Sequence, residues 1–185
     1  GIIREKYGLE PNGYVLFLAR IVPEKGLHYL LEAFRSLHTG KKLVIAGGDS
    51  HSGGYYEEMC QKADEDARTV RTGFVRGAEK DELFTNAALY VLPSDLEGMP
   101  ISLLEAMSYG TPCLVSDIPE NTQLLEKFGA RFAHGDPAAL AKALNRALQA
   151  PPPAGEAQAE YIRQNYSWEK NARDTLYQRA AARRR

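Results

Sequence analysis

Tyr14-Val-Leu-Phe-Leu-Ala19 decides the fold: an unbroken apolar run, followed by the loop Arg20-Ile-Val-Pro-Glu-Lys-Gly26 and then by an amphipathic stretch. A continuous apolar run of this length is typical of a strand covered on both faces, as in a parallel sheet. From Gly26 to His38, apolar residues recur at helical spacing, which predicts a helix. Strand, loop and helix in this order form the repeating unit of a parallel α/β sheet.

The same unit recurs along the chain. We predict strands at Tyr14–Ala19, Lys42–Ala46, Thr69–Thr72, Leu89–Leu92, Pro112–Val115 and Ala130–Ala133. Each is followed by a helix-like or capped segment, most clearly Pro137–Gln149, where the helical spacing returns. The expected fold class is therefore α/β, with a single Rossmann-like, doubly wound parallel sheet of about six strands and helices on both faces.

Residues 1–150 are expected to form this domain. Pro151-Pro-Pro-Ala-Gly155 cannot continue a helix and is predicted to be a linker. Residues 151–185 are predicted to hold the linker and two further helical pieces, from about Glu156 to Asn165 and from about Ser167 onward, with Ser167 as the N-cap.

The composition excludes several protein classes. The 185 residues suit one domain, and 44% hydrophobic and 25% charged residues with a net charge of -1 do not indicate nucleic-acid binding. The Arg-rich end, Arg179–Arg185, is predicted to be a solvated helix end. Cys60 and Cys113 lack the spacing of a metal site or a disulfide framework and are expected to pack in a reducing compartment. With no apolar run of about 18 residues and no signal-peptide pattern, a cytoplasmic location is expected.

In an open parallel sheet, ligands bind beyond the carboxyl ends of the strands. Arg20 and Lys25 share the loop after the first predicted strand, next to a helix N-terminus whose free N–H groups and dipole favour an anion. The loop therefore predicts a phosphate site. The alternative interpretation is that both cations are solvated or pair with Glu24 and Glu32.

A second loop, Pro93-Ser-Asp-Leu-Glu-Gly-Met-Pro100, precedes another predicted helix. Pro100 suits the first turn of that helix, which leaves Glu97 in the loop and puts Glu105 slightly more than one turn into the helix, near one cleft. A carboxylate can accept hydrogen bonds from vicinal sugar hydroxyls, and exposed amides can hold phosphate. The candidate ligands are Glu97, the backbone around Gly98, Met99, Pro100 and Ile101, and Glu105.

Two interpretations of these carboxylates remain open. The apolar neighbours of Glu105 indicate that it is buried and has a partner. The alternative makes Glu97 a helix-capping acid and Glu105 a surface residue.

In a third loop, Thr72-Gly-Phe-Val-Arg-Gly77, Gly73 allows the backbone to turn, so that main-chain groups near Val75 are candidates to contact the edge of a nucleobase. All four histidines, His28, His38, His51 and His134, are expected to be surface or packing residues.

Together these segments resemble the C-terminal domain of the family 4 retaining glycosyltransferases, which have the two-domain GT-B fold. The resemblance covers about Tyr14 to Trp168. Its most specific element is an E-x7-E motif, here Glu97 to Glu105, with an Arg-x4-Lys-Gly loop about 70 residues upstream. Two positions depart from the family pattern: Ala19 stands where glycine is usual, and Gly47-Gly-Asp-Ser50 stands where Gly-x-Gly is usual, so Gly48 is given no role.

The resemblance implies a role for each candidate. Arg20 and Lys25 would bind the diphosphate, Glu105 the ribose hydroxyls, and the backbone around Val75 the base. Glu97 and the Gly98-Met99 turn would face the transferred sugar. No metal and no cofactor are expected, since the two cations and helix dipoles offset the charge on the leaving diphosphate.

The implied reaction is transfer of a hexosyl-type group from a nucleotide diphosphate sugar to an acceptor hydroxyl, with retention at the anomeric carbon. In the family an N-terminal domain binds the acceptor; this sequence lacks it, so we expect donor binding without transfer, and membrane association only through that other half. The segment from Tyr166 onward, with Trp168, Leu176 and Tyr177, resembles a helix that crosses back to it. The alternatives are another GT-B-type enzyme, an epimerase or phosphorylase, or a non-catalytic nucleotide-binding module.

Overall fold

The computed structural model describes residues 1–49 and 53–166. The expectations for His51, for the N-cap Ser167 and the helix after it, and for Arg179–Arg185 lie outside the described residues. Within them, no helix is long and apolar enough to cross a membrane.

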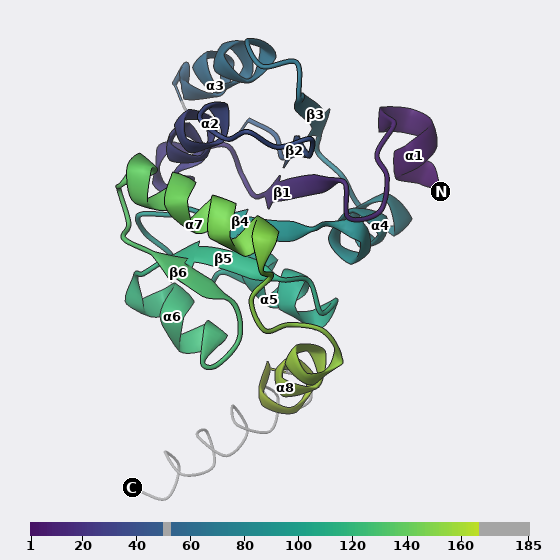
Figure 1. Ribbon diagram of the computed structural model, residues 1–185, viewed down its shortest axis with the longest axis vertical. Helices are drawn as coiled ribbons and strands as arrows, with labels where there is room; N and C mark the ends of the chain where they lie inside the picture. The colour runs from purple at the N-terminus through teal and green to yellow at the C-terminus, as the bar shows by residue number, and fades with distance from the viewer. Residues whose placement is uncertain (50–52, 167–185) are drawn as a thin grey trace, which may run out of the picture.

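The chain forms one six-stranded sheet in which every pairing is parallel, in the order β3-β2-β1-β4-β5-β6 (Figure 1). The strands are β1 (Tyr14–Leu18), β2 (Lys42–Ala46), β3 (Thr69–Gly73), β4 (Leu89–Leu92), β5 (Cys113–Ser116) and β6 (Ala130–Phe132). This confirms the predicted α/β class, and β2 and β4 have the predicted bounds. β5 begins one residue later than predicted; Pro112 lies just before it and contributes only its carbonyl, which accepts from Tyr90 N–H at 2.8 Å.

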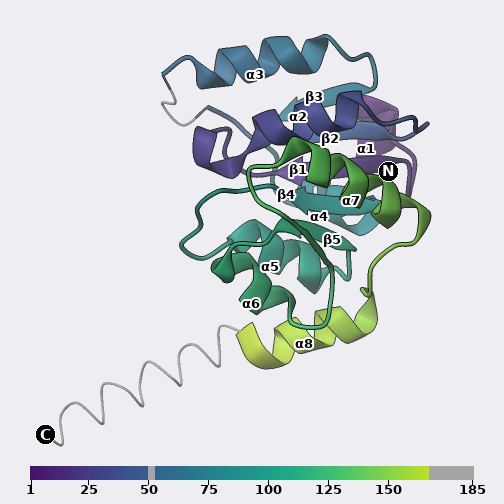
Figure 2. The same cartoon turned by 60° about the vertical axis from the view of Figure 1, so that its left-hand side comes forward.

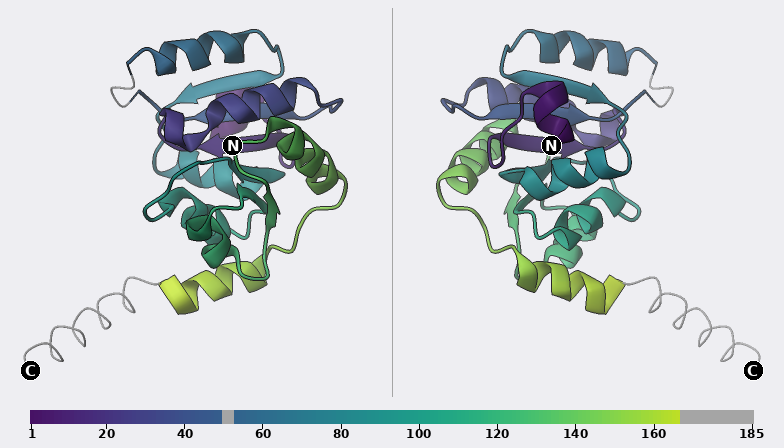
Figure 3. Two further views of the ribbon diagram at one scale, coloured as in Figure 1. Left: turned by 90° about the vertical axis from the view of Figure 1, so that its left-hand side faces the viewer. Right: turned by 90° about the vertical axis from the view of Figure 1, so that its right-hand side faces the viewer.

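Helices cover both faces of the sheet. They are α1 (Ile2–Tyr7), the short 3-10 helix η1 (Pro23–Lys25), α2 (Leu27–Arg35), α3 (Tyr55–Asp64), α4 (Ala78–Asn86), α5 (Ile101–Ser108), α6 (Pro119–Leu125), α7 (Pro137–Gln149) and α8 (Glu156–Tyr166). Figure 3 shows α2 and α7 in front of the sheet in one view and α1 and α4 in front of it in the other.

The alternation of side chains along the strands explains the two layers. In β1, Val15 and Phe17 pack with the residues of α2, α3 and α7, whereas Tyr14 and Leu16 pack with those of α1, α4, α5, α6 and α8. Successive strand residues point to opposite faces, so a run that is buried throughout must have a core on each side. Burial on both faces therefore explains why the run from Tyr14 is apolar at every position.

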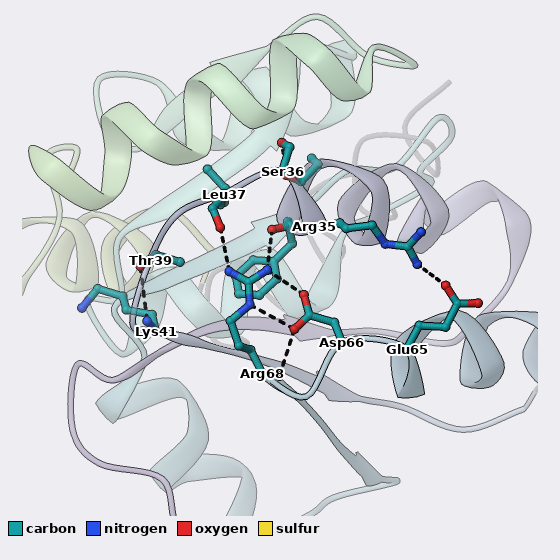
Figure 4. Close-up of polar contacts among 10 residues, drawn as sticks. Arg35, Ser36, Leu37, Thr39, Lys41, Glu65, Asp66 and Arg68 are labelled. Atoms are coloured by element: carbon teal, nitrogen blue, oxygen red, sulfur yellow. Dashed lines mark hydrogen bonds and ion pairs between the residues drawn. The ribbon is translucent and has the colours of Figure 1, made fainter.

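The predicted helix over 26–38 is shorter in the structure, because α2 begins at Leu27 and ends at Arg35. Its C-terminal end is closed by a residue distant in sequence (Figure 4). The guanidinium of Arg68 donates to the carbonyls of Phe34 and Leu37, at 3.2 and 2.7 Å, and to the carboxylate of Asp66. A cation at the negative end of a helix is favourable, and here it also ties α2 to the start of β3.

The proline-rich segment ends α7, as predicted, and is held by backbone hydrogen bonds. Gly155 N–H donates to Gly110 carbonyl at 2.9 Å, and Gly129 N–H donates to Pro153 carbonyl at 3.0 Å. The buried Gln158 of α8 donates to the carbonyls of Met107 and Thr111. α8 therefore packs against α5 at the foot of the sheet (Figure 2).

Candidate functional site

The strand order reverses between β1 and β4. These two strands are neighbours in the sheet, with Val15 beside Leu89 and Leu16 beside Tyr90. The chain leaves β1 toward β2 on one side and leaves β4 toward β5 on the other. A crevice forms at the carboxyl ends of two such strands, and it is where open α/β sheets bind their ligands. The loops predicted from the sequence to carry chemistry, 19–26 and 93–100, follow these two strands.

Glycine brings the two loops into contact. Gly26 has a φ of 72°, and a Cβ at this position would lie 2.0 Å from the carbonyl oxygen of Pro93. The N–H of Asp95 donates to the carbonyl of Glu24 at 2.9 Å. Any side chain at position 26 would therefore force the loops apart.

Lys25 and Glu97 form an ion pair between the loops. The distance from Lys25 Nζ to Glu97 Oε2 is 2.6 Å, and the exposed fractions of the side chains are 15% and 2%. This overturns the pairing of Lys25 with Glu24 or Glu32 that the sequence left open. Glu97 Oε1 is also buried, and no described residue donates to it. A buried carboxylate oxygen without a donor is costly, so this oxygen is suited to accept a hydroxyl from a ligand.

Arg20 is exposed and has no ion-pair partner among the described residues. It lines a cleft of about 400 Å³. The other lining residues come from the ends of β1 and β2, the loop after β3, and α5: Leu18, Ala19, Ala46, Gly47, Gly48, Asp49, Phe74, Val75 and Ser102. A free guanidinium at the mouth of such a cleft can bind an anionic group of a ligand.

Gly47 shapes the floor of this cleft. A Cβ on Gly47 would lie 2.0 Å from the carbonyl oxygen of Ala19, whereas a Cβ on Gly48 would meet nothing within 4 Å. Only glycine allows β1 and the loop after β2 to approach this closely. Although this loop departs from the usual Gly-x-Gly pattern, it keeps Gly47, the glycine that the packing requires.

Phe74 and Val75 also line this cleft. Val75 is buried, and the side chain of Phe74 is 79% exposed. The turn rests on Gly73, whose φ is 70°, as expected from the sequence. An exposed phenyl ring beside a cleft offers a surface on which a planar ring can stack. Sequence reasoning selected Val75 and missed Phe74, although Phe74 directly follows the turn glycine.

The start of α5 differs from the expectation. Pro100 lies just before the helix instead of in its first turn, and the N–H of Ile101, expected to be exposed, donates to the carbonyl of Met99 at 2.8 Å. The N–H groups of Gly98 and Met99 have no partner among the described residues. These two amides remain available to an anion.

Glu105 is less buried than its apolar neighbours suggested. Its side chain is 33% exposed and pairs with Lys80 of α4, with 2.5 Å between Lys80 Nζ and Glu105 Oε1. It does not line the 400 Å³ cleft; instead it borders a second hollow of about 420 Å³ beside α8. The buried carboxylate of the motif is Glu97, so the predicted burial of Glu105 is wrong, whereas the partner expected for Glu105 is present. Lys80 was missed because Ala78-Glu-Lys-Asp-Glu82 looks like a solvated helix start.

Buried polar side chains support the loop after β4. The amide of Asn121 in α6 donates to Ser94 Oγ and Ser116 Oγ, at 3.2 and 3.0 Å, and Ser116 Oγ donates to Ser94 carbonyl at 2.5 Å. Tyr90 OH donates to Ser102 Oγ at 2.7 Å, and burial raises the pKa of Tyr90 well above its usual range, so the phenol stays protonated. Ser102 is thereby fixed at the cleft wall.

The remaining titratable candidates lie elsewhere. His28 Nδ1 is 2.7 Å from Tyr55 OH, and His134 lies beside Asp117 on the surface. Across residues 1–49 and 53–166, no group of three or more His, Cys, Asp or Glu side chains is arranged to hold a metal ion.

Comparison with known proteins places this arrangement in a family. The sequence profile of the glycosyl transferases group 1 matches residues 2–168. An uncharacterized glycosyltransferase of Methanocaldococcus jannaschii is 29% identical over 88% of this chain and 43% of its own length. Alpha-maltose-1-phosphate synthase of Mycobacterium tuberculosis is 30% identical over 95% of this chain and 50% of its own length. The chain thus spans about half the length of these relatives.

The fold has close structural neighbours. The Anabaena protein HepE, solved in complex with UDP-glucose, superposes with a TM-score of 0.81 at 20% identity, over 97% of this chain and 52% of the other. The likeness confirms the Rossmann-like half of a GT-B architecture expected from the sequence. By the match of its sequence along nearly its whole described length, this chain belongs to the glycosyl transferases group 1.

Proposed function

We propose that this chain is the donor-binding domain of a retaining glycosyltransferase. It binds a nucleotide diphosphate sugar, and a segment outside this chain binds the acceptor hydroxyl. The observation that supports the proposal is that two loops carrying groups suited to bind an anion lie together at the strand switch point. Arg20 and Lys25 follow β1, and the free amides of Gly98 and Met99 follow β4.

The proposed binding mode assigns one part of the donor to each element. Arg20, Lys25 and the two amides bind the diphosphate. The nucleoside occupies the cleft of about 400 Å³ between Arg20 and Phe74, a size within the roughly 300 to 1,000 Å³ of small-molecule sites. The backbone around Val75 contacts the base, and Glu105 accepts hydrogen bonds from the ribose hydroxyls.

The chemistry follows from the charges. Breaking the bond from the anomeric carbon to the diphosphate leaves negative charge on the diphosphate, which Arg20, Lys25 and helix N-termini stabilise without a metal. We propose that the acceptor attacks from the same face and that the diphosphate takes its proton. Glu97 is not assigned as a nucleophile; its unpaired Oε1 accepts a hydroxyl of the transferred sugar, and its pairing with Lys25 orients both groups.

The relatives support this assignment. The Anabaena neighbour is described in complex with UDP-glucose, and the mycobacterial relative is named for synthesis of a sugar phosphate. UDP is therefore the first nucleotide to test.

Calorimetric titration with UDP, GDP and ADP, in the presence of EDTA and then with added Mg²⁺, tests donor binding. We expect one nucleotide to bind, with the same affinity in both buffers. Absence of binding to all three would refute donor binding, and binding only with Mg²⁺ would refute the metal-free site. Retention is tested separately in the protein that includes the acceptor-binding segment, by the anomeric configuration of the product.

A further inference from the structure

Lys80 is not itself proposed to bind the donor, yet its only polar contact among the described residues is with a residue that is. Its Nζ lies 2.5 Å from Oε1 of Glu105, and no other polar contact of Lys80 is present among the described residues. Lys80 is the third residue of α4. A cation is disfavoured in the first turn of a helix by the helix dipole. Its position is thus explained by Glu105 and not by its own helix.

The two helices are fixed independently of this ion pair. Tyr109, the C-cap residue of α5, lies four residues beyond Glu105, and its OH donates to Asp81 Oδ1 of α4 at 2.7 Å. The rings of Tyr109 and Phe84 are stacked, with centroids 5.5 Å apart and an angle of 12° between the planes. Removing the charge of Lys80 therefore leaves the α4–α5 contact in place, and a Lys80 variant is expected to fold.

The pair leaves half of the Glu105 carboxylate free. Oε1 accepts from Lys80, whereas Oε2 has no hydrogen-bond partner among the described residues, and a third of the side chain is exposed. A glutamate loses substantial rotamer entropy when it is fixed. A lysine that has already fixed one oxygen removes part of that cost when the other oxygen accepts a ligand hydroxyl.

We propose that Lys80 is a positioning residue for the donor nucleotide: it holds Glu105 with one carboxylate oxygen presented to the ribose, and so makes nucleotide affinity depend on the ribose hydroxyls. The inference rests on the proposed function, because it takes Glu105 as the ribose ligand. Lys80 itself does not contact the nucleotide.

The test uses whichever of UDP, GDP and ADP binds the wild type, written here as UDP, and compares it with its 2′,3′-dideoxy analogue, which keeps the base and diphosphate but lacks both ribose hydroxyls. Each is titrated into the wild type, Lys80→Met, Lys80→Arg and Glu105→Gln. Lys62→Met is the matched control, since Lys62 pairs with Glu58 on α3, away from the cleft. We expect Lys80→Met to weaken UDP binding about threefold to tenfold, to leave dideoxy-UDP binding unchanged, and to be largely rescued by Lys80→Arg. Lys62→Met should match the wild type with both ligands, and thermal unfolding verifies that each variant is folded.

The outcomes separate this inference from the proposed function. If Glu105→Gln weakens UDP binding and Lys80→Met does not, the inference on Lys80 is wrong and donor binding stands. An equal loss for UDP and dideoxy-UDP in Lys80→Met would show that Lys80 acts on the diphosphate or only on the fold, and would also overturn it. If the wild type binds neither UDP nor GDP nor ADP, the proposed function fails and the inference fails with it.

Discussion

Lys25 Nζ lies 2.6 Å from Glu97 Oε2, and this ion pair joins the loop after β1 to the loop after β4 across the strand switch point. The two residues are 72 positions apart in the sequence. Because Glu97 is nearly inaccessible to solvent and no described residue donates to its second oxygen, the pair links the two loops and leaves one acceptor for a ligand.

Replacing Lys25 by methionine should strongly destabilise the fold. The variant leaves the Glu97 carboxylate buried without a counter-charge, and breaking a buried pair from one side costs about 3 to 5 kcal/mol. Urea unfolding measures the loss, and the double variant Lys25→Met/Glu97→Gln should recover part of it. The exposed pair of Lys62 and Glu58 gives the control: Lys62→Met should leave the free energy of unfolding nearly unchanged, since solvent screens an exposed pair. An equal loss of unfolding free energy in Lys25→Met and Lys62→Met would contradict the buried character of the Lys25–Glu97 pair.

Neighbouring glycines at the cleft floor should respond differently to alanine. Gly47→Ala puts a Cβ against the Ala19 carbonyl, so we expect a loss of about 1 to 3 kcal/mol, as for overpacked sites. Gly48→Ala meets no atom and should change the free energy of unfolding by less than about 1 kcal/mol. Urea unfolding of both variants makes the comparison, and an equal effect would mean that β1 and the loop after β2 are not as close as described.

The contact between Arg68 and Asp66 at the end of α2 should make the free energy of unfolding depend on pH in the acid range. Hydrogen bonding from Arg68 lowers the pKa of Asp66. A carboxyl whose pKa is lowered in the folded state stabilises the fold fully above its unfolded pKa of about 3.9, and this stabilisation is lost as pH falls toward the folded pKa. Asp66→Asn should therefore cost about 1 to 2 kcal/mol at pH 7 and less near pH 3. Urea unfolding at the two pH values tests this, and a difference from wild type that is constant with pH would refute the role of ionised Asp66.

Much of the fold could be predicted because a strand that is buried on both faces has a continuous apolar sequence. β4 is a continuous apolar run and β2 is one after Lys42, and the bounds of both were predicted to the residue. α7 was equally clear, since its apolar positions repeat over thirteen residues and Asp136 caps its start. α2 was predicted too long, because what ends it is Arg68, more than thirty residues away, and no local signal marks that contact.

The sequence predicted where the candidate site residues lie in the fold, but not which of them form ion pairs. Arg20 and Lys25 follow β1, and Glu97 and Glu105 lie where the motif put them, since loops and helices are local. Each carboxylate is paired with a cation from a distant part of the chain, Lys25 of η1 or Lys80 of α4, and sequence spacing does not encode these contacts. The same reason hid Lys80, whose neighbours along the chain are charged and give no sign of a contact with α5.

The claim that the switch-point crevice binds the donor diphosphate is tested most directly at Arg20. Unlike Lys25, Arg20 is exposed and has no ion-pair partner in the described chain, so Arg20→Ala should leave thermal unfolding unchanged. Whichever of UDP, GDP and ADP binds the wild type is titrated into Arg20→Ala and into Arg35→Ala, a control that removes an exposed arginine paired with Glu65. Nucleotide affinity should be about tenfold to a hundredfold weaker in Arg20→Ala and unchanged in Arg35→Ala. Equal affinity in Arg20→Ala and the wild type would contradict diphosphate binding at the crevice.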